Sequence, residues 1–262
     1  MIKRQQTPRL PRQASNATYS QRHRRPNAIQ YRLFTSTDLR SDLSWASITE
    51  WWLAELAIDS AYEEVVTPML LEVLEPARGA IYVDIGCGEG RVMRVVTELG
   101  AVVHGLDINP DLAARALPAM VADLLTIPVR DDAYDGVYSA LTLEHVADHE
   151  RFFAEAARVT KPGGVLAVVI NHPVWTAPGS TPISDADGEV LWRPGDYFSD
   201  GSSEVPAGES TVVFHHRSMA DLLNAASAPG WSLEHMIERP HHEFEDQAGI
   251  PRLLACRWRL KV

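Results

Sequence analysis

The chain has 262 residues, of which 45% are hydrophobic, with a formal net charge of −11 and a sequence pI of about 5.3. This length and composition are enough for one sizeable core, with or without an appended cap. The acidic balance argues against a broad nucleic-acid interface, because phosphate binding requires clustered Lys and Arg.

The first 30 residues differ from the rest of the chain. They contain seven basic residues, no acidic residue and three prolines, with almost no apolar periodicity. We therefore predict a disordered basic extension over residues 1–40 and one folded domain over residues 41–262. A transit peptide or an over-long start remain alternatives for the extension.

The rest of the composition favours a cytoplasmic protein. No stretch approaches the roughly 18 apolar residues of a membrane span, and no apolar signal-peptide core lies near the N-terminus. Cys87 and Cys256 form neither a disulfide framework nor a zinc-binding spacing. A reducing compartment is the simplest expectation.

The folded part is predicted to begin with two short helices and to continue as alternating strands and helices. Apolar residues at helical spacing predict the first helices at 45–58 and 60–75. Further elements are expected as strands at 80–86, 101–107, 120–125, 134–141 and 163–170, with helices at 89–100, 110–117 and 149–159. Such alternation is typical of a mostly parallel sheet covered by helices on both faces.

The alternation breaks after Ile170. Residues 171–217 are rich in Gly, Pro, aromatic and acidic residues, and an insertion of this length is usually functional or disordered. We expect it to form a cap over a partly apolar small-molecule pocket and to decide the acceptor, although a packed surface loop would explain the same composition. A helix at 218–227 and strands at 231–239 and 252–262 complete the prediction.

The motif VDIGCGEGR (83–91) joins the first strand of the alternating part to its helix. Its glycines have the spacing G-x-G-x-G, which differs from the G-x-G-x-x-G of dinucleotide-binding folds, and they let the backbone approach a ligand closely. Asp107 ends the next strand, where a carboxylate can accept hydrogen bonds from both hydroxyls of a ribose. Asp123 and Leu124 follow at the end of the third strand, where an adenine would need a polar acceptor and an apolar wall.

Five blocks in this order resemble a known family. VDIGCGEGR, HGLDINP, ADLLTIP, YDGVYSALTLEHV and RVTKPGGVLAVV are similar to the class I S-adenosylmethionine-dependent methyltransferases that act on small molecules, such as the UbiE and type 11 groups. The resemblance is strong over about residues 60–170. It implies an α/β, doubly wound, Rossmann-like fold with a seven-stranded, mostly parallel sheet whose last strand is antiparallel. It also implies S-adenosyl-L-methionine as cofactor and a small organic acceptor.

The resemblance further implies the cofactor-binding residues. Asp84 and the glycine turn would hold the amino-acid end of the cofactor, backbone near Ala140 would bind its amine, Asp107 the ribose, and Ile108, Asp123 and Leu124 the adenine. Tyr62 would close over the cofactor. The complete set is Tyr62, Asp84, Gly86, Cys87, Gly88, Gly90, Asp107, Ile108, Asp123, Leu124 and Ala140.

Methyl transfer from an activated donor needs mainly alignment, and a base is required only when the acceptor must lose a proton. His145 and His172 follow the fourth and fifth strands of the alternating part and are the candidates for that base, although His145 could simply pack or cap the following helix. No metal site is expected from His215–His216 or His241–His242, because adjacent strand residues point to opposite faces. A nicotinamide-dependent oxidoreductase and a non-catalytic cofactor-binding interaction module remain the alternative functions.

Overall fold

The computed structural model describes residues 32–33, 44–58, 60–188, 190–240 and 249–262. Of the predicted extension over residues 1–40, only Arg32–Leu33 lie in this part of the chain, where they form strand β1 and pair antiparallel with β9 (Ser202–Ala207). The remainder of that prediction lies outside the described residues, as does the His241–His242 pair.

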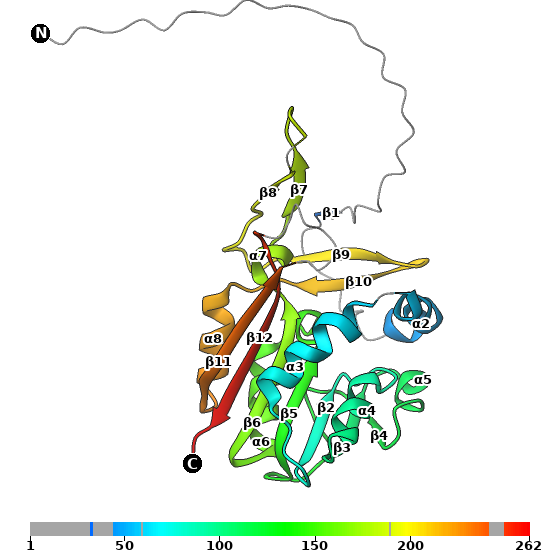
Figure 1. Cartoon of the computed structure of the whole chain (residues 1–262), viewed down its shortest axis with the longest axis vertical. Helices are drawn as coiled ribbons and strands as arrows, with labels where there is room; N and C mark the ends of the chain where they lie inside the picture. The colour runs from blue at the N-terminus through cyan, green and yellow to red at the C-terminus, as the bar shows by residue number, and fades with distance from the viewer. Residues whose placement is uncertain (1–31, 34–43, 59, 189, 241–248) are drawn as a thin grey trace, which may run out of the picture.

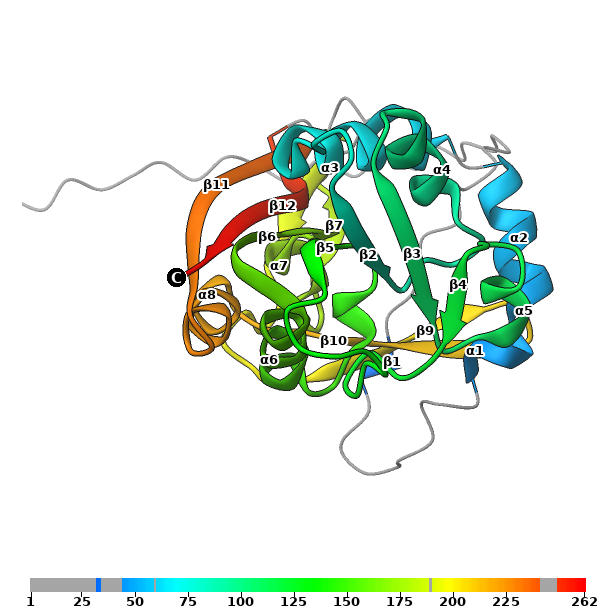
Figure 2. The ribbon, with the colours of Figure 1, turned by 90° about the horizontal axis from the view of Figure 1, so that it is seen from below.

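A seven-stranded sheet with the order β11-β12-β6-β5-β2-β3-β4 forms the centre of the molecule (Figures 1 and 2). The strands β6, β5, β2, β3 and β4 run parallel, and β12 is antiparallel to its neighbours β6 and β11. This confirms the predicted doubly wound sheet with an antiparallel last strand. The bounds are β2 (Ile81–Ile85), β3 (Val102–Asp107), β4 (Ala119–Val121), β5 (Tyr134–Ala140), β6 (Thr160–Asn171), β11 (Trp231–Pro240) and β12 (Pro251–Leu260).

Helices cover both faces of the sheet, as the apolar strands require. On one face, α6 (His149–Val159) and α8 (Met219–Ser227) bury Phe152, Phe153 and Leu222 against it. On the other face, α3 (Thr67–Leu74) and α4 (Arg91–Glu98) pack into a second apolar core. A π-helical turn, η2 (Tyr62–Val66), leads directly into α3. Figure 2 shows the resulting three layers.

Two predicted elements are shorter than expected. The helix predicted over 110–117 ends as α5 (Pro110–Ala113), and the chain continues in tight turns with hydrogen bonds from Arg115 to Leu112 and from Ala116 to Ala113. The strand predicted over 120–125 ends at Val121, because its partner β3 ends at Asp107, with which Val121 is in register. Asp123 and Leu124 therefore lie in the β4–β5 loop (residues 122–133).

The N-terminal helices and part of the insertion pack together. Helices α1 (Ser44–Ser47) and α2 (Thr49–Ile58) lie against the hairpin of β9 and β10 (Ser210–His215). Their shared apolar core contains Ile48, Val205, Ala207 and Val212. We call α1, α2, β9 and β10 together the cap. The sequence predicted the helices and the insertion but not that they form one unit.

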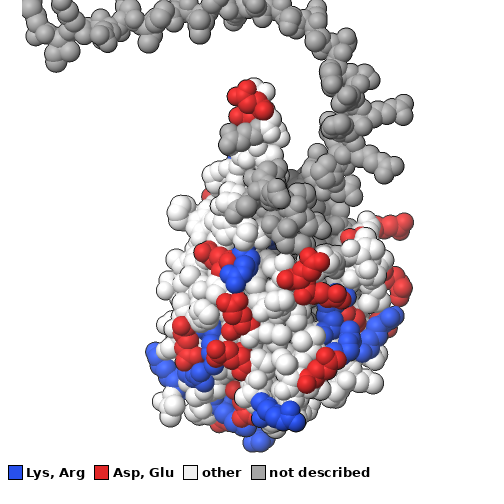
Figure 3. All heavy atoms as spheres, in the orientation of Figure 1, with Lys and Arg blue, Asp and Glu red and all other residues white. Residues whose placement is uncertain are grey.

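The rest of the insertion forms a short helix, α7 (Pro173–Thr176), and a second hairpin of β7 (Thr181–Ser184) and β8 (Val190–Arg193), which projects from the body (Figure 1). Acidic side chains gather at the tip of this projection, whereas both charges are mixed lower on the same face (Figure 3). None of the helices in the described part of the chain has the length and apolar character needed to span a bilayer.

Candidate functional site

A cavity of about 280 Å³ lies at the carboxyl ends of β2, β3 and β5, beneath the cap. Ligands in open α/β sheets bind at this edge, where neighbouring strands lead into helices on opposite faces. All but one of the predicted cofactor-binding residues line the cavity, namely Tyr62, Asp84, Gly86, Cys87, Gly88, Asp107, Ile108, Asp123, Leu124 and Ala140. His145 lines it as well.

Gly90 is the exception, since it does not line the cavity. Gly90 is the N-cap of α4 and has a φ of 83°. A Cβ added there would lie 2.9 Å from the Cα and Cβ atoms of Ala116. Gly90 therefore permits close packing of the helix start against the chain after α5, and it does not contribute to the cavity wall.

The other two glycines shape the wall of the cavity through their backbone. Gly86 and Gly88 have φ values of 75° and 54°, which glycine adopts without strain. The amide groups of Gly86 and Cys87 both donate to the carbonyl of Leu106, and the amide of Gly88 donates to Asp107 Oδ2 at 2.8 Å. Because these donors are already used within the protein, the turn can offer a ligand carbonyl oxygens and close approach.

Two backbone carbonyls, that of Gly86 in the turn and that of Ala140 at the end of β5, lie close to Thr142. Its hydroxyl donates to the carbonyl of Ala140 at 3.2 Å and lies 3.4 Å from that of Gly86. The carbonyl ends of β2 and β5 are thus held close together at the cavity. A pair of carbonyl oxygens with spare lone pairs is suited to accept hydrogen bonds from an ammonium group.

Two carboxylates, those of Asp84 and Asp107, lie beside the turn and line the cavity. Asp84 is 2% exposed, and burial raises its pKa well above the usual value, while the hydroxyl of Tyr138 acts in the opposite direction. Burial also raises the pKa of Asp107, opposed by the amides of Asn109 and Gly88. Asp107 Oδ1 accepts from the Asn109 amide at 2.8 Å, so both carboxylate oxygens have fixed positions.

The cap is fastened to this edge of the sheet by Asn109 and Arg217. Asn109 is buried, and its Nδ2 donates to the carbonyl of Trp45 and to Thr49 Oγ1, which ties the start of α5 to α1 and α2. Arg217 follows β10, and its guanidinium donates to carbonyls of the segment after β5, those of Leu143, Val146 and Ala147. The cavity is thereby enclosed by segments that are distant in sequence.

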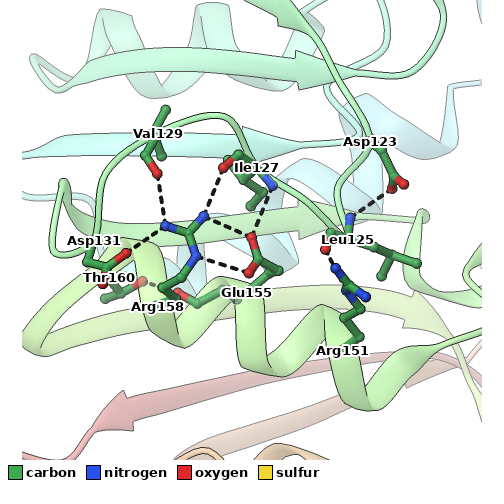
Figure 4. A network of polar contacts seen from close by, with 10 residues as sticks. Asp123, Leu125, Ile127, Val129, Asp131, Arg151, Glu155, Arg158 and Thr160 are labelled. Atoms are coloured by element: carbon green, nitrogen blue, oxygen red, sulfur yellow. Dashed lines mark hydrogen bonds and ion pairs between the residues drawn. The ribbon is translucent and has the colours of Figure 1, made fainter.

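The β4–β5 loop, which carries Asp123 and Leu124, is held against α6 by the network in Figure 4. The Arg158 guanidinium donates to the carbonyls of Ile127 and Val129 at 2.8 Å and to the carboxylates of Asp131 and Glu155. Glu155 Oε2 in turn accepts from the Ile127 amide at 3.0 Å. The planar guanidinium thus connects the loop to the helix at several points.

Replacing Arg158 with Lys is expected to loosen this loop. An ammonium cannot reproduce the fork of parallel hydrogen bonds, so we expect a loss of about 2 kcal/mol in the free energy of unfolding and faster amide exchange over residues 122–133. Hydrogen–deuterium exchange and thermal unfolding measure the two effects. Arg239→Lys is the matched control, because Arg239 forms a half-exposed pair with Glu72 and should change stability by less than about 1 kcal/mol. Unchanged loop exchange in Arg158→Lys would contradict the role given to the network.

One Lys or Arg side chain lines the cavity among the described residues that form its wall, and it is already paired. Arg91 Nε lies 2.7 Å from Glu89 Oε1, and the guanidinium lies 5.0 Å from the centre of the Tyr62 ring. The positive charge of Arg91 is therefore compensated before a ligand enters. Tyr62 lines this side of the cavity.

His145 lies on the cap side of the cavity. Its ring packs edge-on against Trp45 and Phe214, with ring centres 4.9 Å and 4.5 Å apart, and its Nδ1 lies 2.8 Å from the carbonyl oxygen of Val213. Since a carbonyl only accepts, Nδ1 carries the proton in the neutral ring. Burial lowers the pKa of His145, and the carboxylate of Glu144 acts in the opposite direction.

His172, the other candidate base, lies outside the cavity wall. This residue is the N-cap of α7, where Nδ1 accepts from the Val174 amide at 3.1 Å and Nε2 lies 2.7 Å from Glu238 Oε1. Both ring nitrogens are therefore engaged, and His172 does not line the cavity. We interpret His172 as the residue that caps the N-terminus of α7.

The insertion lies behind the cavity wall rather than in it. Among the described residues of 171–217, none lines the cavity, whose cap side is formed by Trp45, Trp52 and Leu56 of the N-terminal helices. The insertion supports His145 from behind through Val213 and Phe214. Sequence reasoning predicted the helices but missed their contact with the cavity. The three tryptophans within residues 45–52 were the available signal.

The comparisons with known proteins agree with this geometry. A sequence model described as a methyltransferase domain matches residues 83–168. The chain is 34% identical to a ubiquinone biosynthesis O-methyltransferase of Rhodopseudomonas palustris over 59% of this chain and 66% of that protein. It is 32% identical to an uncharacterized 37.1 kDa protein of a Streptomyces fradiae transposon, over 47% of this chain and 39% of that protein. The chain thus spans roughly half the length of the curated relatives it matches.

Solved structures extend the likeness to most of the fold. An S-adenosylmethionine-dependent methyltransferase of Mesorhizobium loti is 29% identical with a TM-score of 0.66, covering 78% of this chain and 99% of that one. A 1,6-didemethyltoxoflavin-N1-methyltransferase of Burkholderia thailandensis, 16% identical with a TM-score of 0.57, covers 87% and 94% and shares the fold. The matched residues 83–168 include every sheet-edge carboxylate of the cavity but not Tyr62, His172 or the cap.

Proposed function

We propose that this chain, which belongs to the class I S-adenosylmethionine-dependent methyltransferases, transfers the methyl group of S-adenosyl-L-methionine to a small organic acceptor. One observation carries the proposal. The glycine turn after β2, Asp107 at the end of β3 and the Asp123–Leu124 segment after β4 all line one cavity at the carboxyl edge of the sheet.

The residues present fit this cofactor. A Cβ added at Gly88 would meet no protein atom within 4 Å, so a ligand can approach the backbone there. Asp107 would accept from the ribose hydroxyls, and Ile108, Asp123 and Leu124 would border the adenine. The carbonyls of Gly86 and Ala140, held together by Thr142, would accept from the ammonium of the methionine part, with Asp84 close by and Tyr62 closing the side.

The bound cofactor supplies an activated methyl group on a sulfonium centre. The protein's contribution is to align the acceptor with that group and to exclude water, and the apolar side chains Trp45, Trp52 and Leu56 on the cap side are suited to both tasks. The same apolar surface, with Arg91 already paired to Glu89, favours an uncharged small molecule over a polyanion. We expect the reaction to occur in the cytoplasm, where the free, buried thiols of Cys87 and Cys256 remain reduced.

Calorimetric titration tests the proposal directly. S-adenosylmethionine and S-adenosylhomocysteine should both bind with one site per chain, whereas NADH should give no heat of binding. Binding of NADH alone would instead support the oxidoreductase alternative. Tight S-adenosylmethionine binding without transfer of a labelled methyl group to any small acceptor would favour a non-catalytic module.

A further inference from the structure

The cap determines the protonation of a histidine in the acceptor part of the cavity. Nδ1 of His145 is held by the carbonyl of Val213 on β10, so the neutral ring carries its proton on Nδ1 and leaves the Nε2 lone pair unprotonated. Nε2 has no hydrogen-bond partner among the described residues, and His145 lines the cavity. The ring cannot easily turn, since Trp45 and Phe214 pack against it.

The walls around His145 restrict what can reach it. On the cap side the cavity is bounded by Trp45, Trp52 and Leu56, which offer flat and aliphatic surfaces. Arg91, the one Lys or Arg side chain among the described residues that line the cavity, is paired with Glu89 at 2.7 Å. An anionic acceptor would therefore enter without a free counter-charge, whereas a neutral aromatic ring would pack against the indoles.

We propose that His145 is a catalytic base whose Nε2 accepts the proton of an aromatic hydroxyl, so that the acceptor class is a neutral phenol. This inference rests on the proposed methyltransferase function and deepens it. A single unprotonated nitrogen can accept one proton, and the aromatic side chains beside it favour a flat acceptor. The two together favour an acceptor with an acidic proton on an aromatic ring. An aliphatic alcohol is too weak an acid for an imidazole to deprotonate effectively.

The step balances as follows. The phenol oxygen forms a bond to the methyl carbon while its proton passes to Nε2 of His145, and the carbon–sulfur bond breaks with its electron pair remaining on sulfur. The resulting imidazolium keeps its Nδ1–H bond to Val213 and returns its Nε2 proton to solvent. The adjacent buried carboxylate of Glu144 favours this charged form.

The rate of methyl transfer should depend on pH in one direction. Burial lowers the pKa of His145 below its ordinary value, and the carboxylate of Glu144 partly offsets this effect. The neighbouring His215 on β10 is neutral as well, because burial and Arg217 lower its pKa to about 4. His145 is therefore neutral and able to accept a proton at pH 7. Methyl transfer to a phenol should decrease only as the pH falls through the lowered pKa of His145.

Nitrogen-15 NMR of the cofactor-free protein tests the base without any turnover. With histidine labelled in the ring, His145 should show a protonated Nδ1, an unprotonated Nε2 and a pKa below the ordinary value for histidine. Assignment is made with His145→Asn. A ring that is protonated on Nε2, or charged at pH 7, would overturn the proposal.

Activity of the full chain with substituted phenols of decreasing pKa tests the acceptor class. His145→Asn should lower kcat by about 100-fold to 10,000-fold with phenol itself, and less with pentafluorophenol, which ionises without help. The binding of S-adenosylhomocysteine should not change. His149→Asn, at the start of α6 and outside the cavity wall, is the matched control and should keep full activity.

The outcomes separate the two proposals. Undiminished methyl transfer to phenol by His145→Asn would overturn the role of His145 as the catalytic base. Binding of S-adenosylmethionine with transfer to alkylamines or carboxylic acids but to none of the phenols would overturn the acceptor class and leave the methyltransferase proposal standing. Absence of any S-adenosylmethionine binding would overturn both.

Discussion

Replacing Asp107 with Asn is expected to weaken S-adenosylmethionine binding by about 100-fold. Both carboxylate oxygens of Asp107 are already held by backbone amides, from Gly88 and Asn109, and each keeps a further lone pair for a ribose hydroxyl. A hydrogen bond to a charged group contributes about 1.5–3 kcal/mol, so the loss of the charge corresponds to roughly two orders of magnitude in Kd. Asn also presents an NH₂ group to one of the two amides.

Calorimetry with S-adenosylmethionine measures this effect. Asp111→Asn is the matched control, because Asp111 lies in the first turn of α5, four residues away, and does not line the cavity. The control should bind as the unaltered protein does. A decrease of less than about threefold for Asp107→Asn would show that Asp107 supports the turn without contacting a ligand.

Replacing Gly86 with Ala is expected to destabilise the fold and the cavity together. The new Cβ would lie 2.3 Å, 2.4 Å and 2.8 Å from the Oγ1, Cγ2 and Cβ atoms of Thr142, and the φ of 75° is itself unfavourable for alanine. Overpacking costs about 1–3 kcal/mol and the left-handed backbone about 1–2 kcal/mol. Together they should lower the unfolding midpoint by roughly 10 °C.

Two further variants separate the clash from the backbone strain. Gly79 has nearly the same φ, 79°, but a Cβ there meets no atom within 4 Å, so Gly79→Ala should show the strain alone. Adding Thr142→Ala to Gly86→Ala should remove most of the clash and recover stability towards the level of Gly79→Ala. Thermal unfolding of the three proteins measures this. Equal midpoints for Gly86→Ala and Gly79→Ala would contradict the clash.

Much of the cofactor side of the cavity could be predicted because its residues follow from local rules. Asp107 and Gly86 lie at strand ends, and the carboxyl ends of parallel strands meet at one edge of a sheet whatever else the chain does. Gly90 shows the limit of such reasoning. The motif predicted a close approach of the backbone to a ligand, but the close contact that Gly90 makes is with Ala116, in a turn that only the folded chain brings near.

The acceptor side could not be predicted in the same way. Trp45 and Trp52 reach the cavity because the cap hairpin holds their helices over the sheet, and His145 meets Val213 from 68 residues away. By sequence position, His172 is as good a candidate base as His145, but in the folded chain its Nε2 lies against Glu238. The periodicity of a sequence says which side of an element is buried, but not which distant side chain will meet it.

By itself, then, the sequence determined the order of strands and helices, the glycine turn and the carboxylates at the strand ends, because these depend on backbone conformation and on apolar periods of a few residues. Only the tertiary structure decided which histidine faces the cavity, in which tautomer, and beneath which aromatic residues. Those features arise from packing between α1, α2, β10 and the segment after β5, and packing depends on shape and hydrogen-bond partners that no local pattern records.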